Sequence, residues 1–564
     1  MPSGPQDSAG SCKPTVCTTD DDALSTLASN WLETCTRKHE LCRPVDPGFQ
    51  PTRLIQILNA DQVRLILPAE EPSGPYVAFS HCWGGVQAVK LLRGDIGRFR
   101  TGLRVKELPE SYQEAISICI RMNLHFIWID SLCIIQDSHE DWKREALTMK
   151  LVYGNSLLNL CAAAGSNSGE RSTSSRQPDL VKPFEITSSW ANQDPQSVFV
   201  IFGDLFYDDV LQSPLHTRAW VYQEYYLSKR SLVLGRSQLW WHCREKLACE
   251  GCSNGLPDEL LTSTDSAWSL AATLKDDLHR VKVISRFRSA EAWQDRVQKY
   301  TQMFLTKETD RIIAFSGIVE AFGESHNVAD QYLAGLWRCY LPYGLRWIVG
   351  RDAIMRRGSV YRTPSWSWIS LGGHFAMGGG VSETLLSSLE RIWPHYDEQD
   401  KGIMALSKGG AIEVRGHLMG PRKVGGQGEP SYFEASFLFS QYLRRNMQST
   451  PQPRSRVSWD EHEALGEPLV SYLDGLNLAS RGKALIDGAH REQMRLRDAP
   501  GSFFYLPLET DGETGFLEGI VLYQPPHQPG IFHRVGEWSA RECIDGSPAG
   551  DLATKYPEQT VYII

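Results

Sequence analysis

The feature that most constrains the fold is a run of strand, helix and strand patterns in residues 125–164. An apolar segment at residues 126–129 ends in Asp130, a helix pattern follows Ser138, and a second apolar segment covers residues 156–164. Two strands that are separated by a helix pair in parallel, because the helix forms the crossover that returns the chain to the same end of the sheet. The run therefore predicts an α/β fold with a parallel sheet flanked by helices.

A second strand and helix precede this run. Residues 76–80 form a strand pattern that leads into a polar, glycine-rich turn, and a helix with proline in its first turn begins near Pro109. In a parallel sheet, ligands bind outside the carboxyl ends of the strands. Because Ser80, Trp83, Gly84 and Asp130 follow two such strand ends, we expect these residues to face one crevice.

Composition and charge exclude several classes of protein. With 564 residues, 41% of them hydrophobic, and 17 tryptophans, the chain can build the cores of about two or three domains. Its net charge of −9 is spread along the sequence without a basic patch, so no nucleic-acid partner is expected. No apolar run is long enough to span a membrane. The 13 scattered cysteines and the polar N-terminus indicate free thiols in a cytoplasmic protein.

Changes of pattern along the chain predict four parts. Residues 1–22 are expected to be disordered, and residues 23–255 to form the α/β domain. A helical region follows at residues 256–400. Residues 401–564 alternate like short strands and predict a β-rich C-terminal region, which a polar, mobile insert interrupts near residues 446–463.

Glu145 is the first candidate for catalysis. It lies on the helix after Ser138, on a face that is otherwise apolar. The other positions of this face are Trp142, Met149, Val152 and Tyr153. Burial on such a face raises the pKa of a carboxyl group, which suits a general acid or base, or a group that binds ribose hydroxyls or a developing cation. The alternative is a structural ion pair at the margin of this face, with Arg144, Lys150 or another basic residue.

Four other residues could bind a ligand. Asp130 could bind a hydroxyl group or cap the turn that follows its strand. Trp83 and Gly84 could line a flat aromatic site or form a simple turn. Arg218 shares a predicted helix with Trp220, Gln223 and Glu224, and it could recognise a phosphate or form an ion pair across the domain.

Two clusters of cysteine and histidine have spacings that bear on metal binding. The first is Cys35-x3-His39-x2-Cys42, which lacks a nearby fourth ligand, and its spacing is not that of a standard zinc finger. The second is Cys243-x5-Cys249-x2-Cys252 with His242, which matches no common zinc module. We therefore interpret the cysteines as core thiols and His39 as a helix cap, and we predict no metal site.

Seven segments in order resemble the fungal heterokaryon-incompatibility (HET) domain. They occupy roughly residues 30–245 and are Cys35-x3-His39-x2-Cys42, PTRLIQIL, YVAFSHCWGG, LPESYQEAI, FIWIDSLCIIQD, DWKREALTMKLVYGNS and RAWVYQEYYLSKR. One departure is His81, where the family more often has tyrosine. The downstream segments TDRIIAFSGI and PSWSW resemble the helical region that often follows this domain.

The resemblance implies a cytoplasmic protein of fungal self/non-self recognition, which triggers programmed cell death and self-associates or binds an allelic protein partner. The HET domain is also remotely similar to Toll/interleukin-1 receptor (TIR) domains, which have a flavodoxin-like sheet. Many TIR domains cleave the nicotinamide–ribose bond of NAD with a glutamate that lies on a helix, a few residues after a tryptophan. Trp142-x2-Glu145 resembles that arrangement.

By this analogy, NAD is a substrate rather than a cofactor, and Glu145 binds its ribose hydroxyls and stabilises an oxocarbenium-like state. Trp83 and the turn at Gly84 would hold nicotinamide. The substrate-binding set that we predict is Ser80, Trp83, Gly84, Asp130, Trp142 and Arg218. Two alternatives remain open: a non-catalytic interaction module, and a HET-like protein of a secondary-metabolite pathway that acts on a small molecule or regulates the pathway.

Overall fold

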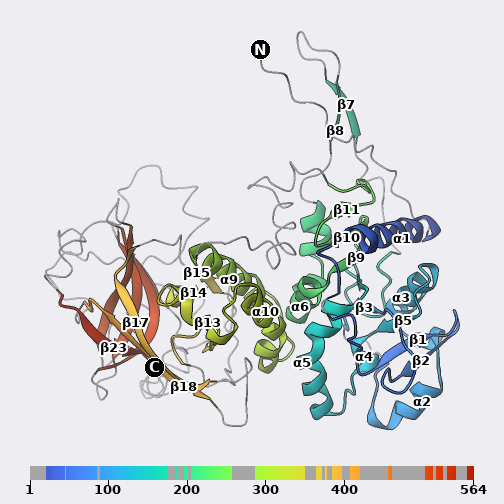
Figure 1. The fold of residues 1–564 in the computed structure, drawn as a ribbon. Helices are drawn as coiled ribbons and strands as arrows, with labels where there is room; N and C mark the ends of the chain where they lie inside the picture. Colours follow the sequence, from blue (N-terminus) through green and yellow to red (C-terminus); the bar gives the residue numbers. More distant parts are fainter. Residues whose placement is uncertain are drawn as a thin grey trace, which may run out of the picture. The chain divides into compact units, whose positions relative to one another are not determined.

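The structure is a computed structural model of the chain (Figure 1). It describes residues 21–44, 46–84, 89–173, 184–188, 196–200, 205–256, 286–349, 364–370, 375–377, 384–396, 407–419, 455–459, 502–511, 516–524, 530–540 and 556–563. The predicted disordered N-terminus lies outside these residues except for its last two positions, which begin a helix.

The chain divides into two compact units. The first contains residues 1–281, 303–305 and 311–321, and the second contains residues 282–302, 306–310 and 322–564. Each unit has its own sheet.

The described part of the first unit is built around a nine-stranded sheet in the order β11-β10-β9-β6-β3-β5-β1-β2-β4. The strands are β1 Leu54–Ile57, β2 Gln62–Ile66, β3 Val77–Ser80, β4 Leu103–Arg104, β5 Phe126–Trp128, β6 Leu158–Cys161, β9 Arg230–Leu234, β10 Leu239–Cys243 and β11 Leu247–Cys249. A separate hairpin joins β7 Phe184–Ser188 to β8 Gln196–Val200.

The four central strands, β5, β3, β6 and β9, are parallel, as the sequence predicts. β3 and β6 are buried along their whole length, which explains their continuous apolar patterns. From β3 the chain crosses to β5 on one side, and from β5 it crosses to β6 on the other side of β3. The carboxyl end of β3 is therefore a point where the strand order reverses, and such points form ligand-binding crevices in α/β sheets.

The sheet as a whole is mixed, so the prediction of a parallel sheet is correct only for its centre. β1, β2 and β4 extend one side as antiparallel strands, and β10 and β11 extend the other. The reason is the length of the connections: β1 to β2 and β9 to β10 are joined by only a few residues, which is too short for the crossover that parallel pairing needs.

Helices cover both faces of this sheet. They are α1 Asp21–Lys38, α2 Ile96–Thr101, α3 Glu110–Arg121, α4 Asp130–Cys133, α5 His139–Asn155 and α6 Ala219–Leu227. Residues 311–321 of α10 Arg311–Ser325 also belong to the first unit. The crossovers through α3 and α5 run in opposite directions along the sheet, and since crossovers are right-handed, these two helices lie on opposite faces. α1 packs beside α3, and α6 packs beside α5 (Figure 1).

Local sequence signals explain where two of these helices begin. Pro109 stands at the N-cap of α3 in an extended conformation. Ser138 caps α5, because its side-chain oxygen accepts a hydrogen bond from the backbone N–H of Asp141, as the capping-box pattern predicts.

The second unit begins with α9 Arg286–Thr301 and continues into a β-rich region. Its larger sheet, among the described residues, has the order β16-β20-β21-β22-β23-β18-β17, with β19 paired to β22. These strands are β16 Thr384–Leu385, β17 Ser387–Tyr396, β18 Ser407–Gly416, β19 Ser455–Trp459, β20 Ser502–Asp511, β21 Phe516–Gln524, β22 Ile531–Ala540 and β23 Gln559–Ile563. Smaller pairs join β12 Tyr332–Leu333 to β13 Leu336–Trp337, and β14 Trp347–Val349 to β15 Phe375–Met377.

The predicted fold class, an α/β region followed by helices and a β-rich C-terminal region, is confirmed. Within the insert predicted near residues 446–463, the described residues 455–459 form strand β19, and the other residues of the insert lie outside the described part of the chain. In the described residues, no helix combines the length and the apolar character that a membrane span requires.

Candidate functional site

The carboxyl end of β3 carries a buried polar cluster centred on Glu224. Ser80, the last residue of β3, donates a hydrogen bond of 2.6 Å from its hydroxyl to Oε2 of Glu224, which α6 presents. The hydroxyl of Tyr153 on α5 donates a second bond of 2.9 Å to the same oxygen. The hydroxyl oxygen of Ser80 also lies 3.1 Å from the side-chain oxygen of Asn159. A strand end and two helices thus converge on one carboxylate.

Burial dominates the electrostatics of this carboxylate. It raises the pKa of Glu224 to about 7, although Arg218 and the hydroxyl donor Ser80 favour the ionised form. The side chain is almost fully enclosed, since Glu224 is only 5% exposed. Glu224 is therefore poised between its two protonation states at neutral pH, as acid–base groups in active sites often are.

Trp83 and Asp130 meet beside this cluster, as the positions of their strands predict. The indole Nε1 of Trp83 donates a hydrogen bond of 2.8 Å to Oδ2 of Asp130. The other oxygen of Asp130 accepts a bond of 2.6 Å from the backbone N–H of Ser131 and so caps the turn after β5. Asp130 and Trp83 are both half-buried. Asp130 therefore fills the capping role that the sequence left open, and its second oxygen holds the indole.

Gly84 lies at the end of the turn after β3 and is confined by its surroundings. Its φ is +65°, in the left-handed region that favours glycine. A Cβ atom at this position would lie 2.1 Å from Cβ of Asn167, so no other residue fits without moving the loop after β6. That loop is also bonded to Trp83, whose carbonyl accepts a hydrogen bond of 3.2 Å from the hydroxyl of Ser168.

A third group connects the two strand ends through neutral side chains. Nε2 of His81 lies 2.8 Å from the hydroxyl of Tyr112, which lies 2.8 Å from the hydroxyl of Ser131. Burial lowers the pKa of His81 to about 4, so its imidazole is neutral at physiological pH. Arg218, at the N-cap of α6, donates a hydrogen bond to the carbonyl of His81. Its guanidinium therefore contacts the β3 turn.

Comparison with protein families identifies this part of the chain. Residues 76–224 match the model of the family "Heterokaryon incompatibility protein (HET)". The match begins directly before β3 and ends on Glu224, so it includes β3, α5 and the part of α6 that reaches the cluster.

The chain carries a HET domain.

No curated protein and no solved structure is detectably similar to the chain. The HET match covers the sequence motifs from YVAFSHCWGG to RAWVYQE, which carry the resemblance to the HET domain.

Glu145 has a different set of partners from the Glu224 cluster. Its partners are the guanidinium groups of Arg53, at 3.8 Å, and Arg144, at 3.3 Å, together with a hydrogen bond from Thr52. Arg53 also bonds to Asp141 and to the carbonyl of Cys133. Burial raises the pKa of Glu145, and Arg53 partly offsets this shift. These contacts match the structural alternative for Glu145, which is an ion pair with Arg144 or another basic residue.

Trp142 lies on α5 and faces α6. Its ring stacks on His139 with centroids 5.8 Å apart and meets the ring of Trp220 edge-on at 6.3 Å. Lys150, the other basic residue considered as a partner of Glu145, forms an ion pair with Glu320 of α10. Of the predicted site residues, Ser80, Trp83, Gly84, Asp130 and Arg218 thus gather around the β3 turn, whereas Glu145 and Trp142 contact other residues.

Glu224 and Tyr153 are site residues that we did not select from the sequence, and the same holds for Asn159, His81, Tyr112 and Ser131. A signal for Glu224 was present, because Trp220-x3-Glu224 places a glutamate on a helix shortly after a tryptophan. It was easy to overlook because α6 is buried almost all round, so its acid does not stand out on a single apolar face.

A cysteine and histidine cluster lies elsewhere in the first unit. The ligand atoms of Cys35, His39, Cys42 and Cys243 all lie within 4.8 Å of one another. Cys243 therefore joins the first cysteine motif rather than Cys249 and Cys252, with which the sequence analysis grouped it. His242, the remaining member of the second motif, hydrogen-bonds to the hydroxyl of Tyr225 at 2.7 Å.

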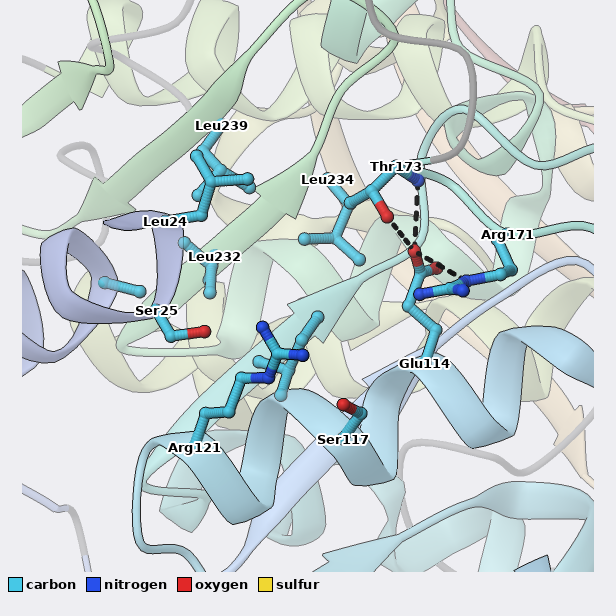
Figure 2. Close-up of a pocket in the computed structure, with 12 residues that line it drawn as sticks. Leu24, Ser25, Glu114, Ser117, Arg121, Arg171, Thr173, Leu232, Leu234 and Leu239 are labelled. Atoms are coloured by element: carbon cyan, nitrogen blue, oxygen red, sulfur yellow. Dashed lines mark hydrogen bonds and ion pairs between the residues drawn. The ribbon is translucent and has the colours of Figure 1, made fainter. Parts of the chain in front are cut away.

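A small pocket of about 30 Å³ lies between α1, α3, β9 and β10 (Figure 2). Glu114 borders this pocket and accepts hydrogen bonds from the backbone N–H groups of Ser172 and Thr173, at 2.8 and 3.0 Å. Its carboxylate also pairs with Arg171 at 3.9 Å. The pocket has room for water rather than for a nucleotide, and Glu114 anchors the loop that follows β6.

Proposed function

We propose that the HET domain cleaves the nicotinamide–ribose bond of NAD and thereby triggers cell death in fungal self/non-self recognition. We assign the catalytic role to Glu224 rather than to Glu145. The observation that carries the proposal is the Glu224 carboxylate, which is buried at the carboxyl end of β3 and bonded by Ser80 and Tyr153. It occupies the place where open α/β sheets bind ligands.

Two features support the analogy with TIR domains. The parallel strands have the order β5-β3-β6-β9, which is second, first, third and fourth along the chain, as in flavodoxin-like sheets. Trp220-x3-Glu224 also puts a glutamate a few residues after a tryptophan on a helix. Trp142-x2-Glu145 shares that second feature, but its carboxylate is paired with arginines.

The proposed reaction consumes one water molecule. The bond between C1′ of the ribose and the nicotinamide nitrogen breaks, and its electron pair leaves with nicotinamide. Water attacks the resulting oxocarbenium carbon and loses a proton, which yields ADP-ribose. The ionised carboxylate of Glu224 stabilises the positive charge as it develops. Because the pKa of Glu224 is about 7, a large share of the molecules carry this ionised form at neutral pH.

The surrounding residues have matching roles in binding. The indole of Trp83, which Asp130 holds in place, offers a flat surface for nicotinamide. The guanidinium of Arg218 has further N–H donors for the pyrophosphate, beyond the one that it gives to His81. Since Glu224 is only 5% exposed, the substrate reaches it only after neighbouring residues move. This burial is in keeping with a latent activity that self-association or an allelic partner switches on.

The decisive experiment compares the two glutamates. Wild type, Glu224→Gln and Glu145→Gln are expressed in fungal cells, and viability and NAD content are followed after induction. We expect Glu224→Gln to lower the rate of NAD loss about 100- to 1,000-fold, which is the usual effect of removing one electrostatic stabiliser of a transition state. Glu145→Gln should retain NAD cleavage and killing.

Three results would contradict the proposal in different ways. If Glu145→Gln alone stops NAD loss, the catalytic carboxylate has been misassigned. If Glu224→Gln is folded and still consumes NAD, Glu224 only stabilises the core. If cells die while NAD stays constant, the domain acts as a non-catalytic interaction module.

A further inference from the structure

We propose that the first unit contains a structural zinc site formed by Cys35, His39, Cys42 and Cys243. Two observations carry this inference: the four ligand atoms converge, and a buried arginine beside them contacts no acidic residue in the described part of the chain. The site is separate from the Glu224 cluster, and the inference does not depend on the proposed NAD cleavage.

The four side chains come from two distant segments of the chain. Cys35 lies in the last turn of α1, and His39 and Cys42 follow that helix directly. Cys243 is the last residue of β10, 204 residues from His39. The motif has no fourth ligand nearby in the sequence, because the fold brings Cys243 to it from the C-terminal part of the domain.

The geometry fits a tetrahedral zinc ion. Zn–S bonds of about 2.3 Å and Zn–N bonds of about 2.0 Å place the ligand atoms about 3.5 to 3.8 Å apart. Sγ of Cys243 lies 3.3 Å from Nδ1 of His39, and all four ligand atoms lie within 4.8 Å of one another. Small rotations of the side chains therefore bring them to the coordination distances.

The donor set points to zinc in a structural role. Three thiolates and one imidazole form one of the ligand sets that bind structural zinc, and soft sulfur donors disfavour magnesium and calcium. Cys35 and Cys42 are fully buried, Cys243 is 3% exposed, and His39 is half-buried. With four protein ligands and so little exposure, no position stays open for a catalytic water molecule.

Arg230 supplies the independent electrostatic argument. Its guanidinium is buried and donates to Sγ of Cys35 at 3.1 Å and to the carbonyls of Cys42 and Leu157 at 2.7 and 3.1 Å. Within the described residues it contacts no carboxylate. A buried cation without a negative partner is costly. Zinc bound by three thiolates and one neutral histidine carries one net negative charge, which Arg230 would balance.

The position of the site suggests what the metal does. α1 is attached to the sheet near β10 by the rings of Trp31 and Trp241, whose centroids are 6.2 Å apart, and by a hydrogen bond of 2.7 Å from Trp31 to the carbonyl of Ser253. A zinc ion coordinated by Cys35 and Cys243 would add a second connection between α1 and β10. The metal would thus fix α1 to strand β10 of the sheet.

The test measures the metal content of the full chain, purified under reducing conditions without chelators. We expect close to one zinc ion per chain by mass spectrometry of the metal. Cys243→Ser should lower the zinc content to near zero. The matched control is Cys119→Ser, which changes a cysteine of α3 that is equally buried but lies outside the cluster, and it should keep the zinc.

A second measurement, on the wild-type chain, tests the proposal even if the Cys243→Ser variant fails to fold. In the wild-type chain, cobalt in place of zinc should give the intense visible absorption of a tetrahedral ion and the charge-transfer bands of thiolate ligands. His39→Cys should preserve binding, since four cysteines are also a structural zinc set. Wild-type protein that holds no zinc and gives only the weak spectrum of octahedral cobalt would overturn the proposal. A disulfide among these cysteines in metal-free wild-type protein would overturn it as well.

Discussion

Glu145 and Glu224 are two buried carboxylates on neighbouring helices of one domain, and their surroundings differ in charge. Glu145 is 2% exposed and shares an ion-pair network with Arg53, Arg144 and Asp141. Glu224 is 5% exposed, and its hydrogen bonds come from the neutral hydroxyls of Ser80 and Tyr153. The positive charge of Arg218 also acts on Glu224, but these two described side chains form no ion pair with each other. Burial alone therefore does not identify a reactive acid. The comparison indicates that the charge of the partners separates a structural carboxylate from one that is free to titrate near neutral pH.

Removing Arg53 should have the largest effect on stability. Arg53→Met leaves the buried Asp141 and Glu145 with only the exposed Arg144 as a cationic partner, and we expect a loss of about 3 to 5 kcal/mol in the free energy of unfolding. Urea denaturation measures this loss. In the control Arg64→Met, which breaks the half-exposed pair with Glu71, the loss should stay below about 1 kcal/mol. Equal losses in the two variants would remove the distinction between the Glu145 network and an ordinary surface pair.

The pH dependence of stability should separate the two carboxylates next. The pKa of Glu224 is about 7 in the folded protein and lies near 4.5 when the chain unfolds. The folded state therefore holds this proton more tightly between these values, and the contribution of Glu224 to the stability of wild type should fall as pH rises from 4.5 to 7. The loss can reach about 3 kcal/mol.

The Glu224→Gln variant isolates this effect, because His81, whose pKa is lowered to about 4, titrates with the opposite sign in both proteins. Unfolding of wild type and Glu224→Gln at pH 5 and pH 8 should therefore differ in its pH dependence. Glu145→Gln should change the pH dependence less, because Arg53 offsets the raised pKa of Glu145. A wild type and a Glu224→Gln variant with parallel pH curves would mean that Glu224 does not titrate in this range.

Removing a hydroxyl donor should have the smallest effect. Ser80→Ala takes one hydrogen bond from Glu224 and should cost about 1.5 to 3 kcal/mol at pH 8, where the carboxylate is ionised. The cost should be smaller at pH 5. The control Ser156→Ala removes a buried bond to the carbonyl of Tyr153 and should cost about 1 kcal/mol at both pH values. A pH-independent cost for Ser80→Ala would show that its partner is not charged.

Local patterns in the sequence were enough to predict the strands and helices around the site. The apolar runs that end in Ser80 and Asp130 predicted two neighbouring strand ends, and Trp83 and Asp130 do meet there. Ser138 and Asp141 likewise predicted the start of α5. These features depend on residues that are close in sequence, so periodicity and capping signals contain them.

Contacts between distant residues could not be predicted in the same way. Glu145 occupies a buried helical face as expected, but its role depends on its ion pair with Arg53. Arg53 also binds Asp141, which lies 88 residues later in the chain. The fourth member of the cysteine cluster lies 204 residues from His39. The acid of α6 was missed because a helix that is buried all round has no polar face against which Glu224 would stand out.

The arrangement of the nine-stranded sheet has a practical consequence for work with isolated HET domains. Residues 76–224 contain β3, β5 and β6, but the outer neighbours of β5 and β6, which are β1 and β9, lie outside this range. A protein cut at those limits would therefore expose two open strand edges, which promote aggregation. It would also leave β4 without its partner β2. The segment that the family model recognises is thus smaller than the sheet that makes it stable.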